Sequence, residues 1–114
     1  MRIPASALIP LLLIALSGQS VWADEAYARI KFPPDGAKLD AMAQNRIDYE
    51  VNPGPRGDHI HLYVDNHEAA ILRKLAGNHV LDTMAPGPHT LCIKVVNKAH
   101  VPIGVEQCVK VAVE

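Results

Sequence analysis

The sequence predicts an all-β sandwich of about seven strands, preceded by a signal peptide that is removed on export. Short apolar runs, several with strict alternation, are separated by clusters of Pro, Gly, Asn and Asp. The last two runs align as a hairpin that pairs the two cysteines, Cys92 and Cys108. The signal peptide is predicted from the first residues of the chain.

The N-terminus has the three parts of a secretory signal. Arg2 supplies the charge, residues 7–16 are almost all Leu, Ile and Ala, and the three residues ending at Ala23 suit a signal peptidase. We place cleavage after Ala23, which leaves a single domain at residues 24–114 in the periplasm or outside the cell. The alternative is an uncleaved anchor, but the apolar run is shorter than the roughly 20 residues that span a bilayer. Stable membrane insertion after cleavage is not expected.

Each predicted strand is bounded by turn residues. Residues 46–51 alternate apolar with charged side chains, and the last two strands are rich in Val and Ile. Residues 68–75 fit either one helical turn or an edge strand, and Gly77-Asn78 is expected to turn the chain. The segments, in order, are 27–32, 46–51, 59–65, the ambiguous 68–75, 80–84, 89–96 and 105–113.

Three features agree on one register for the last two strands. Pairing Cys92 with Cys108 places Lys94 opposite Glu106 and puts the Val and Ile side chains on the other face. In an exported chain two cysteines favour a disulfide. This bond would close a loop of about 15 residues and contribute roughly 3 kcal/mol. A pair of thiolate metal ligands is the alternative.

The composition argues against several functions. The formal net charge is −1 and no basic run occurs, so nucleic-acid binding has no support. Residues 24–114 contain no Ser, which excludes a Ser/His/Asp hydrolase, and bonded cysteines would leave no thiol nucleophile. No Gly-rich phosphate loop or zinc-protease motif occurs. We therefore expect that the protein is not an enzyme.

Histidine is the over-represented functional residue, with six in the chain. Alternation along 59–65 places His59 and His61 on one face, about 6–7 Å apart at the backbone, a recurrent geometry for two metal ligands. In an immunoglobulin-like sandwich the third strand lies beside the penultimate one. His59 would then lie near Val96, and His100 just beyond it could be a third ligand. Imidazole outside the cytoplasm suits copper, the expected cofactor, with zinc possible.

Other interpretations of the polar residues stay open. A His-x-His pair can also be an ordinary exposed polar face or a surface that contacts a partner. Tyr63 and Asp65 could orient an imidazole, and Met84 could add a thioether ligand. His89 is expected with His67 and Asp65 at the opposite end of the sheet.

Three motifs together carry a family resemblance. They are the entry turn FPPDGA at 32–37, the strand DHIHLYVD at 58–65 and the strand start PGPHTL at 86–91. In this order they resemble small bacterial periplasmic proteins of immunoglobulin-like type with an H-x-H-x-x-x-D strand, some of which resemble copper-handling proteins. The resemblance covers most of residues 26–114 and implies an immunoglobulin-like β-sandwich. The Cys-His-Met ligand set of blue-copper proteins is missing, which argues against electron transfer.

Two functions of different classes follow. The first is an exported periplasmic metal-binding protein, in metal homeostasis or delivery, with the ligands His59, His61 and His100 and with a metal ion or a periplasmic protein as its partner. The alternative is a non-enzymatic envelope interaction or assembly module that binds no metal.

Overall fold

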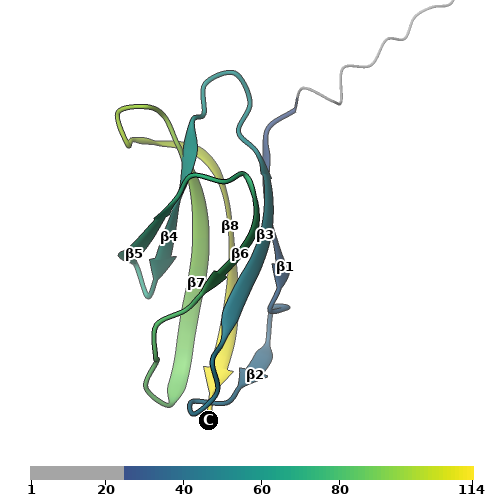
Figure 1. Ribbon diagram of the computed structural model, residues 1–114, viewed down its shortest axis with the longest axis vertical. Helices are drawn as coiled ribbons and strands as arrows, with labels where there is room; N and C mark the ends of the chain where they lie inside the picture. Colours follow the sequence, from purple (N-terminus) through teal and green to yellow (C-terminus); the bar gives the residue numbers. More distant parts are fainter. Residues whose placement is uncertain (1–24) are drawn as a thin grey trace, which may run out of the picture.

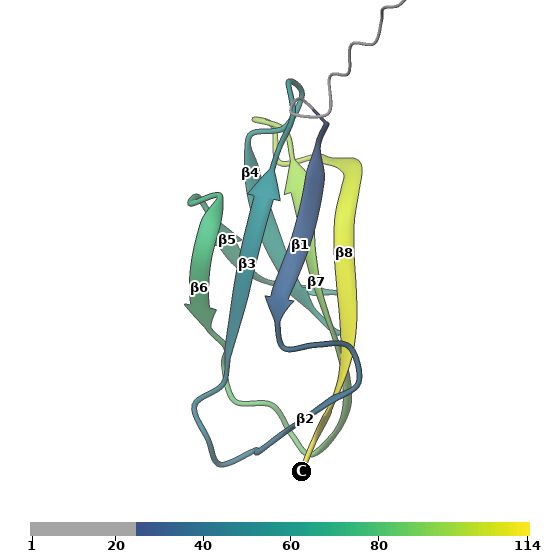
Figure 2. The same cartoon turned by 90° about the vertical axis from the view of Figure 1, so that its right-hand side faces the viewer.

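The computed structural model describes residues 25–114, so the predicted signal peptide at 1–23 lies outside the described residues. The described chain forms two facing sheets, which confirms the predicted all-β sandwich (Figures 1 and 2). None of these residues belongs to a helix that could cross a membrane. The eight strands are β1 (Tyr27–Phe32), β2 (Ala37–Leu39), β3 (Arg46–Asn52), β4 (His59–Val64), β5 (His67–Leu72), β6 (Ala76–Val80), β7 (Gly87–Val96) and β8 (Pro102–Val113).

The two sheets differ in size. The larger has the strand order β2-β8-β7-β4-β5, and the smaller has the order β1-β3-β6. Neighbouring strands are antiparallel except β2, which pairs parallel with β8. The β3–β4 and β7–β8 loops lie at one end of the sandwich, at the top of Figure 1, and the C-terminus lies at the other. The two loops therefore bring residues distant in sequence to the same end.

Apolar side chains between the sheets form the core. Ile47, Tyr49 and Val51 on β3 are buried and alternate with more exposed residues, as a strand with one buried face should. The Tyr49 hydroxyl donates a hydrogen bond to the Lys74 carbonyl at 3.1 Å, so its polar end is satisfied. Each fully buried Val, Leu or Ile contributes roughly 1.5–3 kcal/mol. The aliphatic residues with the least exposure are Ile47, Ile60, Leu62, Leu91, Ile93, Val95 and Val96.

The β7–β8 hairpin has the predicted register. Cys92 pairs with Cys108 and Lys94 pairs with Glu106. The two cysteines form a disulfide, and no free cysteine is left, which removes the thiolate-ligand alternative. The register shifts between Lys94 and Val96. The hairpin is thus covalently fixed in its middle and irregular only near the loop.

Several predicted elements are corrected. The ambiguous segment 68–75 forms an edge strand, β5, rather than a helical turn. Gly77 and Asn78 do not turn the chain but pair with β3 inside β6, where Gly77 takes a φ of 144° that favours glycine. Of the expected strand 80–84, only its first residue is extended, as the end of β6. Strand β2 was not predicted because its three residues are too short to show alternation.

Candidate metal centre

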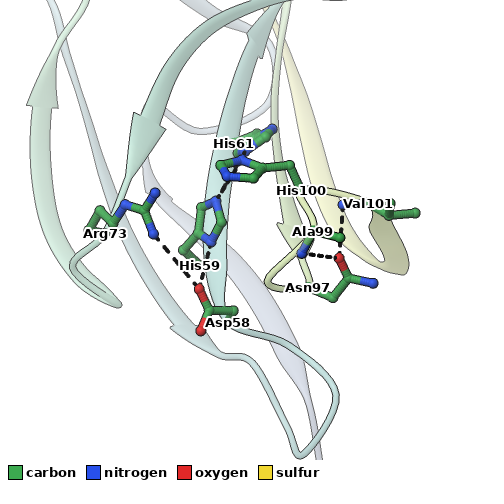
Figure 3. Close-up of polar contacts among 8 residues, drawn as sticks. All are labelled: Asp58, His59, His61, Arg73, Asn97, Ala99, His100 and Val101. Carbon is green, nitrogen blue, oxygen red and sulfur yellow. Dashed lines mark hydrogen bonds and ion pairs between the residues drawn. The ribbon is translucent and has the colours of Figure 1, made fainter.

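Three histidines meet at the loop end of the larger sheet (Figure 3). His59 and His61 lie on β4, and His100 lies in the β7–β8 loop. The Nε2 atoms of His59 and His61 are 3.2 Å apart. Nδ1 of His100 is 3.2 Å from Nε2 of His59 and 3.0 Å from Nε2 of His61. The structure therefore brings together all three residues that were predicted as metal ligands.

Strand pairing on both sides fixes the first two histidines. β4 lies between β5 and β7, and His59 is opposite Val96 while His61 is opposite Lys94. The predicted neighbourhood of His59 and Val96 is thus confirmed. The residues His59 and His61 are 1% and 3% exposed. The interpretation of this pair as an exposed polar face is wrong, because the ring of His100 lies against both rings and β5 places Glu68 beside His61.

A side chain in the β7–β8 loop holds His100 in place. Oδ1 of Asn97 accepts hydrogen bonds from the backbone N–H groups of Ala99, at 2.9 Å, and Val101, at 3.0 Å (Figure 3). The carbonyl of Asn97 accepts from the N–H of His100, also at 2.9 Å. His100 has a φ of 66°, a left-handed conformation that is uncommon for residues other than glycine. These hydrogen bonds stabilise the loop conformation in which the ring of His100 contacts the rings of His59 and His61 on β4.

A carboxylate sets the tautomer of His59. Nδ1 of His59 lies 2.8 Å from Oδ2 of Asp58, and a carboxylate can only accept, so Nδ1 carries the proton and donates it. The same hydrogen bond lowers the pKa of Asp58, which therefore stays ionised at neutral pH. Arg73 also lies 3.8 Å from this carboxylate. When Nδ1 carries the only ring proton, the lone pair of Nε2 faces the other two rings.

His61 is held neutral by burial. Removal of its ring from water lowers the pKa of His61, and the nearby carboxylate of Glu68 offsets only part of that effect. Nδ1 of His61 lies 3.2 Å from Oε1 of Glu68 but without hydrogen-bond geometry, and it is a buried nitrogen with no hydrogen-bond partner. The contacts of Nε2 with the other two rings can run in either direction in the free protein, and the negative charge of Glu68 favours the proton on Nδ1 when Nε2 binds a cation.

The resulting arrangement suits a cation. Three ring nitrogens face one another at 3.0–3.2 Å, and a cation at this point can accept a lone pair from each of them. With metal–nitrogen bonds of about 2.0–2.1 Å, two ligand nitrogens are about 2.9 Å apart at 90° and about 3.3 Å apart at a tetrahedral angle. The observed separations of 3.0–3.2 Å lie between these values. One ion can therefore contact all three nitrogens.

The remaining polar residues have other roles. Both ring nitrogens of His89 are engaged, Nδ1 with Oδ2 of Asp65 at 2.5 Å and Nε2 with the Ala85 carbonyl at 2.6 Å. The predicted meeting of His89 and Asp65 is thus confirmed. Tyr63 lies under the ammonium group of Lys94, 4.6 Å from the ring centroid. Asp65 holds the ring of His89 rather than a ring of the cluster, and Tyr63 is a neighbour of the His61 ring, with the two ring centroids 6.4 Å apart.

Met84 does not join the cluster. It is 8% exposed and packs in the core between the sheets, on the opposite side of β4 from the histidines. The expected thioether ligand is therefore not supplied by Met84. His67 and His79 lie in β5 and β6.

Three residues that position the histidines were not predicted from the sequence. Asp58 precedes His59, and its adjacency was a usable signal because a side chain just outside a strand can fold back onto the first ring. Glu68 and Asn97 gave no such signal. The contact of Glu68 depends on a register shift between β4 and β5, and that of Asn97 depends on the shape of a loop.

Comparison with known proteins places the fold. No protein-family model matches the chain, and no curated protein matches it. Among solved structures, the fibronectin(III)-like modules of CbhA from Clostridium thermocellum match with a TM-score of 0.63 and 11% identity over 76% of this chain and 95% of theirs. The fold is of the fibronectin(III)-like, immunoglobulin type. At this identity the likeness shows the fold alone.

Two further matches agree with this fold. An engineered protein matches with a TM-score of 0.56 and 15% identity, over 79% of this chain and 20% of that one. The extracellular domain of the putative one component system BT4673 from B. thetaiotaomicron matches with a TM-score of 0.50 and 13% identity. This second match covers 71% of this chain and 12% of the other, so the chain corresponds to one module of a much longer protein.

Proposed function

We propose that this chain is an exported, non-enzymatic protein that binds copper, or alternatively zinc, through Nε2 of His59, Nε2 of His61 and Nδ1 of His100. The observation that carries the proposal is the convergence of these three nitrogens within 3.0–3.2 Å, two of them on buried rings. A metal ion at this point can accept a lone pair from each of the three nitrogens.

The surroundings of the cluster support metal binding. A metal-bound imidazole commonly donates its other N–H to a carboxylate, which fixes the ring and makes the ligand more basic. Asp58 provides this contact to His59 at 2.8 Å, and Glu68 places a second carboxylate 3.2 Å from Nδ1 of His61. The two carboxylates also offset the charge of a divalent ion. Imidazole nitrogens suit copper and zinc better than calcium or magnesium.

Export and a role in delivery are part of the same proposal. The signal-like N-terminus and the disulfide both support a compartment outside the cytoplasm. His100 is exposed and lies on a loop, whereas the two strand histidines are buried. A periplasmic partner can therefore reach one ligand of the three, as delivery of a metal to that partner would require.

Calorimetric titration of the purified protein with zinc and with copper tests the proposal. We expect one ion per chain with a dissociation constant below about 1 μM, which corresponds to about −8 kcal/mol. The His59→Ala/His61→Ala variant should lose this binding, and His67→Ala, at an exposed histidine on β5, should keep it. Binding weaker than micromolar, or binding unchanged in the double variant, would favour a metal-free interaction module instead.

A further inference from the structure

The three nitrogens form a nearly equilateral triangle, and this shape restricts the metal. The sides are 3.0, 3.2 and 3.2 Å. Two nitrogens on opposite sides of an ion would be about 4 Å apart for bonds of about 2.0 Å. No pair in the cluster approaches that separation. An ion bound to all three therefore has its protein ligands on one side, with nitrogen–metal–nitrogen angles of about 94–103° for bonds of about 2.05 Å.

The triangle cannot easily open. His59 and His61 are two residues apart on β4, which is paired on both sides, and Asp58 holds the His59 ring. Moving these two rings to opposite sides of an ion would require one of them to leave the outer face of the strand. His100 lies almost equally far from both, so it stands over the pair rather than in line with either.

Copper responds to this restriction differently in its two oxidation states. Cu(II) prefers a tetragonal arrangement, in which four ligands lie in one plane around the ion. In this cluster two nitrogens can lie in such a plane, and the third lies outside it. Water would have to fill the other two positions of the plane, close to the rings of His59 and His61, which are only 1% and 3% exposed. A d¹⁰ ion has no geometric preference of its own and accepts three nitrogens on one side. Cu(I) and Zn²⁺ are both d¹⁰ ions.

We propose that the cluster holds copper as Cu(I) in preference to Cu(II), an inference that rests on the proposed metal-binding function. The consequence is a raised reduction potential for the bound ion. Each tenfold difference between the two dissociation constants raises the potential by 59 mV for this one-electron couple. A preference of about 100-fold therefore corresponds to about 120 mV relative to the free ion.

Competition titrations with chromophoric chelators, one for each oxidation state, test this proposal. The purified protein is titrated with Cu(I) in ascorbate without oxygen and with Cu(II) in air, and its intact disulfide is verified by mass. We expect a dissociation constant for Cu(I) at least about 100-fold below that for Cu(II), with Zn²⁺ also bound tightly. The electron paramagnetic resonance spectrum of any bound Cu(II) should show no more than two equatorial nitrogens.

A variant of one residue tests whether the preference for Cu(I) depends on the arrangement of the three nitrogens. His100→Ala leaves two adjacent nitrogens, which fit a tetragonal Cu(II) plane, so the ratio of the two constants should fall at least tenfold. Because His100 is exposed in a loop, the fold is expected to persist, and His67→Ala is the matched control. Equal or tighter binding of Cu(II) in the wild type, or a ratio unchanged by His100→Ala, would overturn the preference alone. Failure of copper and zinc alike to bind would overturn the proposed function itself.

Discussion

Removal of the Asp58 carboxylate should weaken metal binding although Asp58 does not contact the ion. Its Oδ2 accepts the Nδ1 proton of His59 at 2.8 Å, so it fixes both the tautomer and the direction of the ring. Loss of such a contact typically costs 10–100-fold in metal affinity. At a free zinc concentration of about 100 times the wild-type dissociation constant, the wild-type site is about 99% filled, and the Asp58→Ala site would be about 50–90% filled.

The assay is a competition titration with a chromophoric zinc chelator, which avoids redox chemistry. Asp58→Asn is the informative second variant, because an amide oxygen still accepts the Nδ1 proton while the charge is lost, and we expect a loss smaller than that of Asp58→Ala. Asp82→Ala, which removes an exposed carboxylate away from the cluster, is the matched control. An Asp58→Ala dissociation constant within threefold of the control value would refute the reasoning.

Three further predictions concern the scaffold. Replacing Cys92 and Cys108 by Ala should lower the free energy of unfolding by about 3 kcal/mol for a loop of about 15 residues, as measured by urea unfolding, and an unchanged midpoint would contradict this. The hydrogen bond between His89 and Asp65 raises the pKa of His89 and lowers that of Asp65. The stability that the raised pKa of His89 contributes is complete below the unfolded pKa of 6.5 and is lost as pH rises through the higher folded pKa. The stability that the lowered pKa of Asp65 contributes is present above the unfolded pKa of 3.8 and is lost as pH falls through the lower folded pKa. The difference in free energy of unfolding between wild type and His89→Ala should thus be largest between about pH 4 and 6.5. We expect about 1 kcal/mol there, because Asp65 is partly exposed. A difference that grows above pH 8 would contradict this prediction. Gly57→Ala, two residues before β4, should both destabilise the protein by about 1–3 kcal/mol and weaken zinc binding, because a Cβ there would lie 2.4 Å from the carbonyl oxygen of Pro53. Stability and affinity equal to those of the wild type would show that the loop adapts freely.

Much of the fold could be predicted because its signals are local. The alternation in β3 and the Cys92–Cys108 register depend on residues close in sequence, and both predictions were confirmed. β6 was misplaced because Gly77-Asn78 has the composition of a turn, and only pairing with β3 keeps it extended. The parallel contact of β2 depends on the far end of the chain, where no local pattern could indicate it.

The candidate site was predictable in its ligands but not in its surroundings. Strand alternation brought His59 and His61 to one face, and immunoglobulin-like topology brought His100 to the same end. The burial of the strand pair, by contrast, depends on the path of the β7–β8 loop and on β5. Tyr63 lies beside the ring of His61, as the shared strand face predicted, and its ring also contacts the ammonium group of Lys94. Contacts made across loops and bulges are set by tertiary structure, so the sequence alone did not indicate them.

Nitrogen-15 NMR of the histidine rings during a zinc titration tests the central claim most directly, because it identifies the nitrogen that binds. We expect the resonances of Nε2 of His59, Nε2 of His61 and Nδ1 of His100 to change together and to saturate at one zinc per chain. The ring nitrogens of the other three histidines should stay unchanged. Saturable changes at those three instead, or no change at the cluster, would contradict the claim that these residues form a metal site.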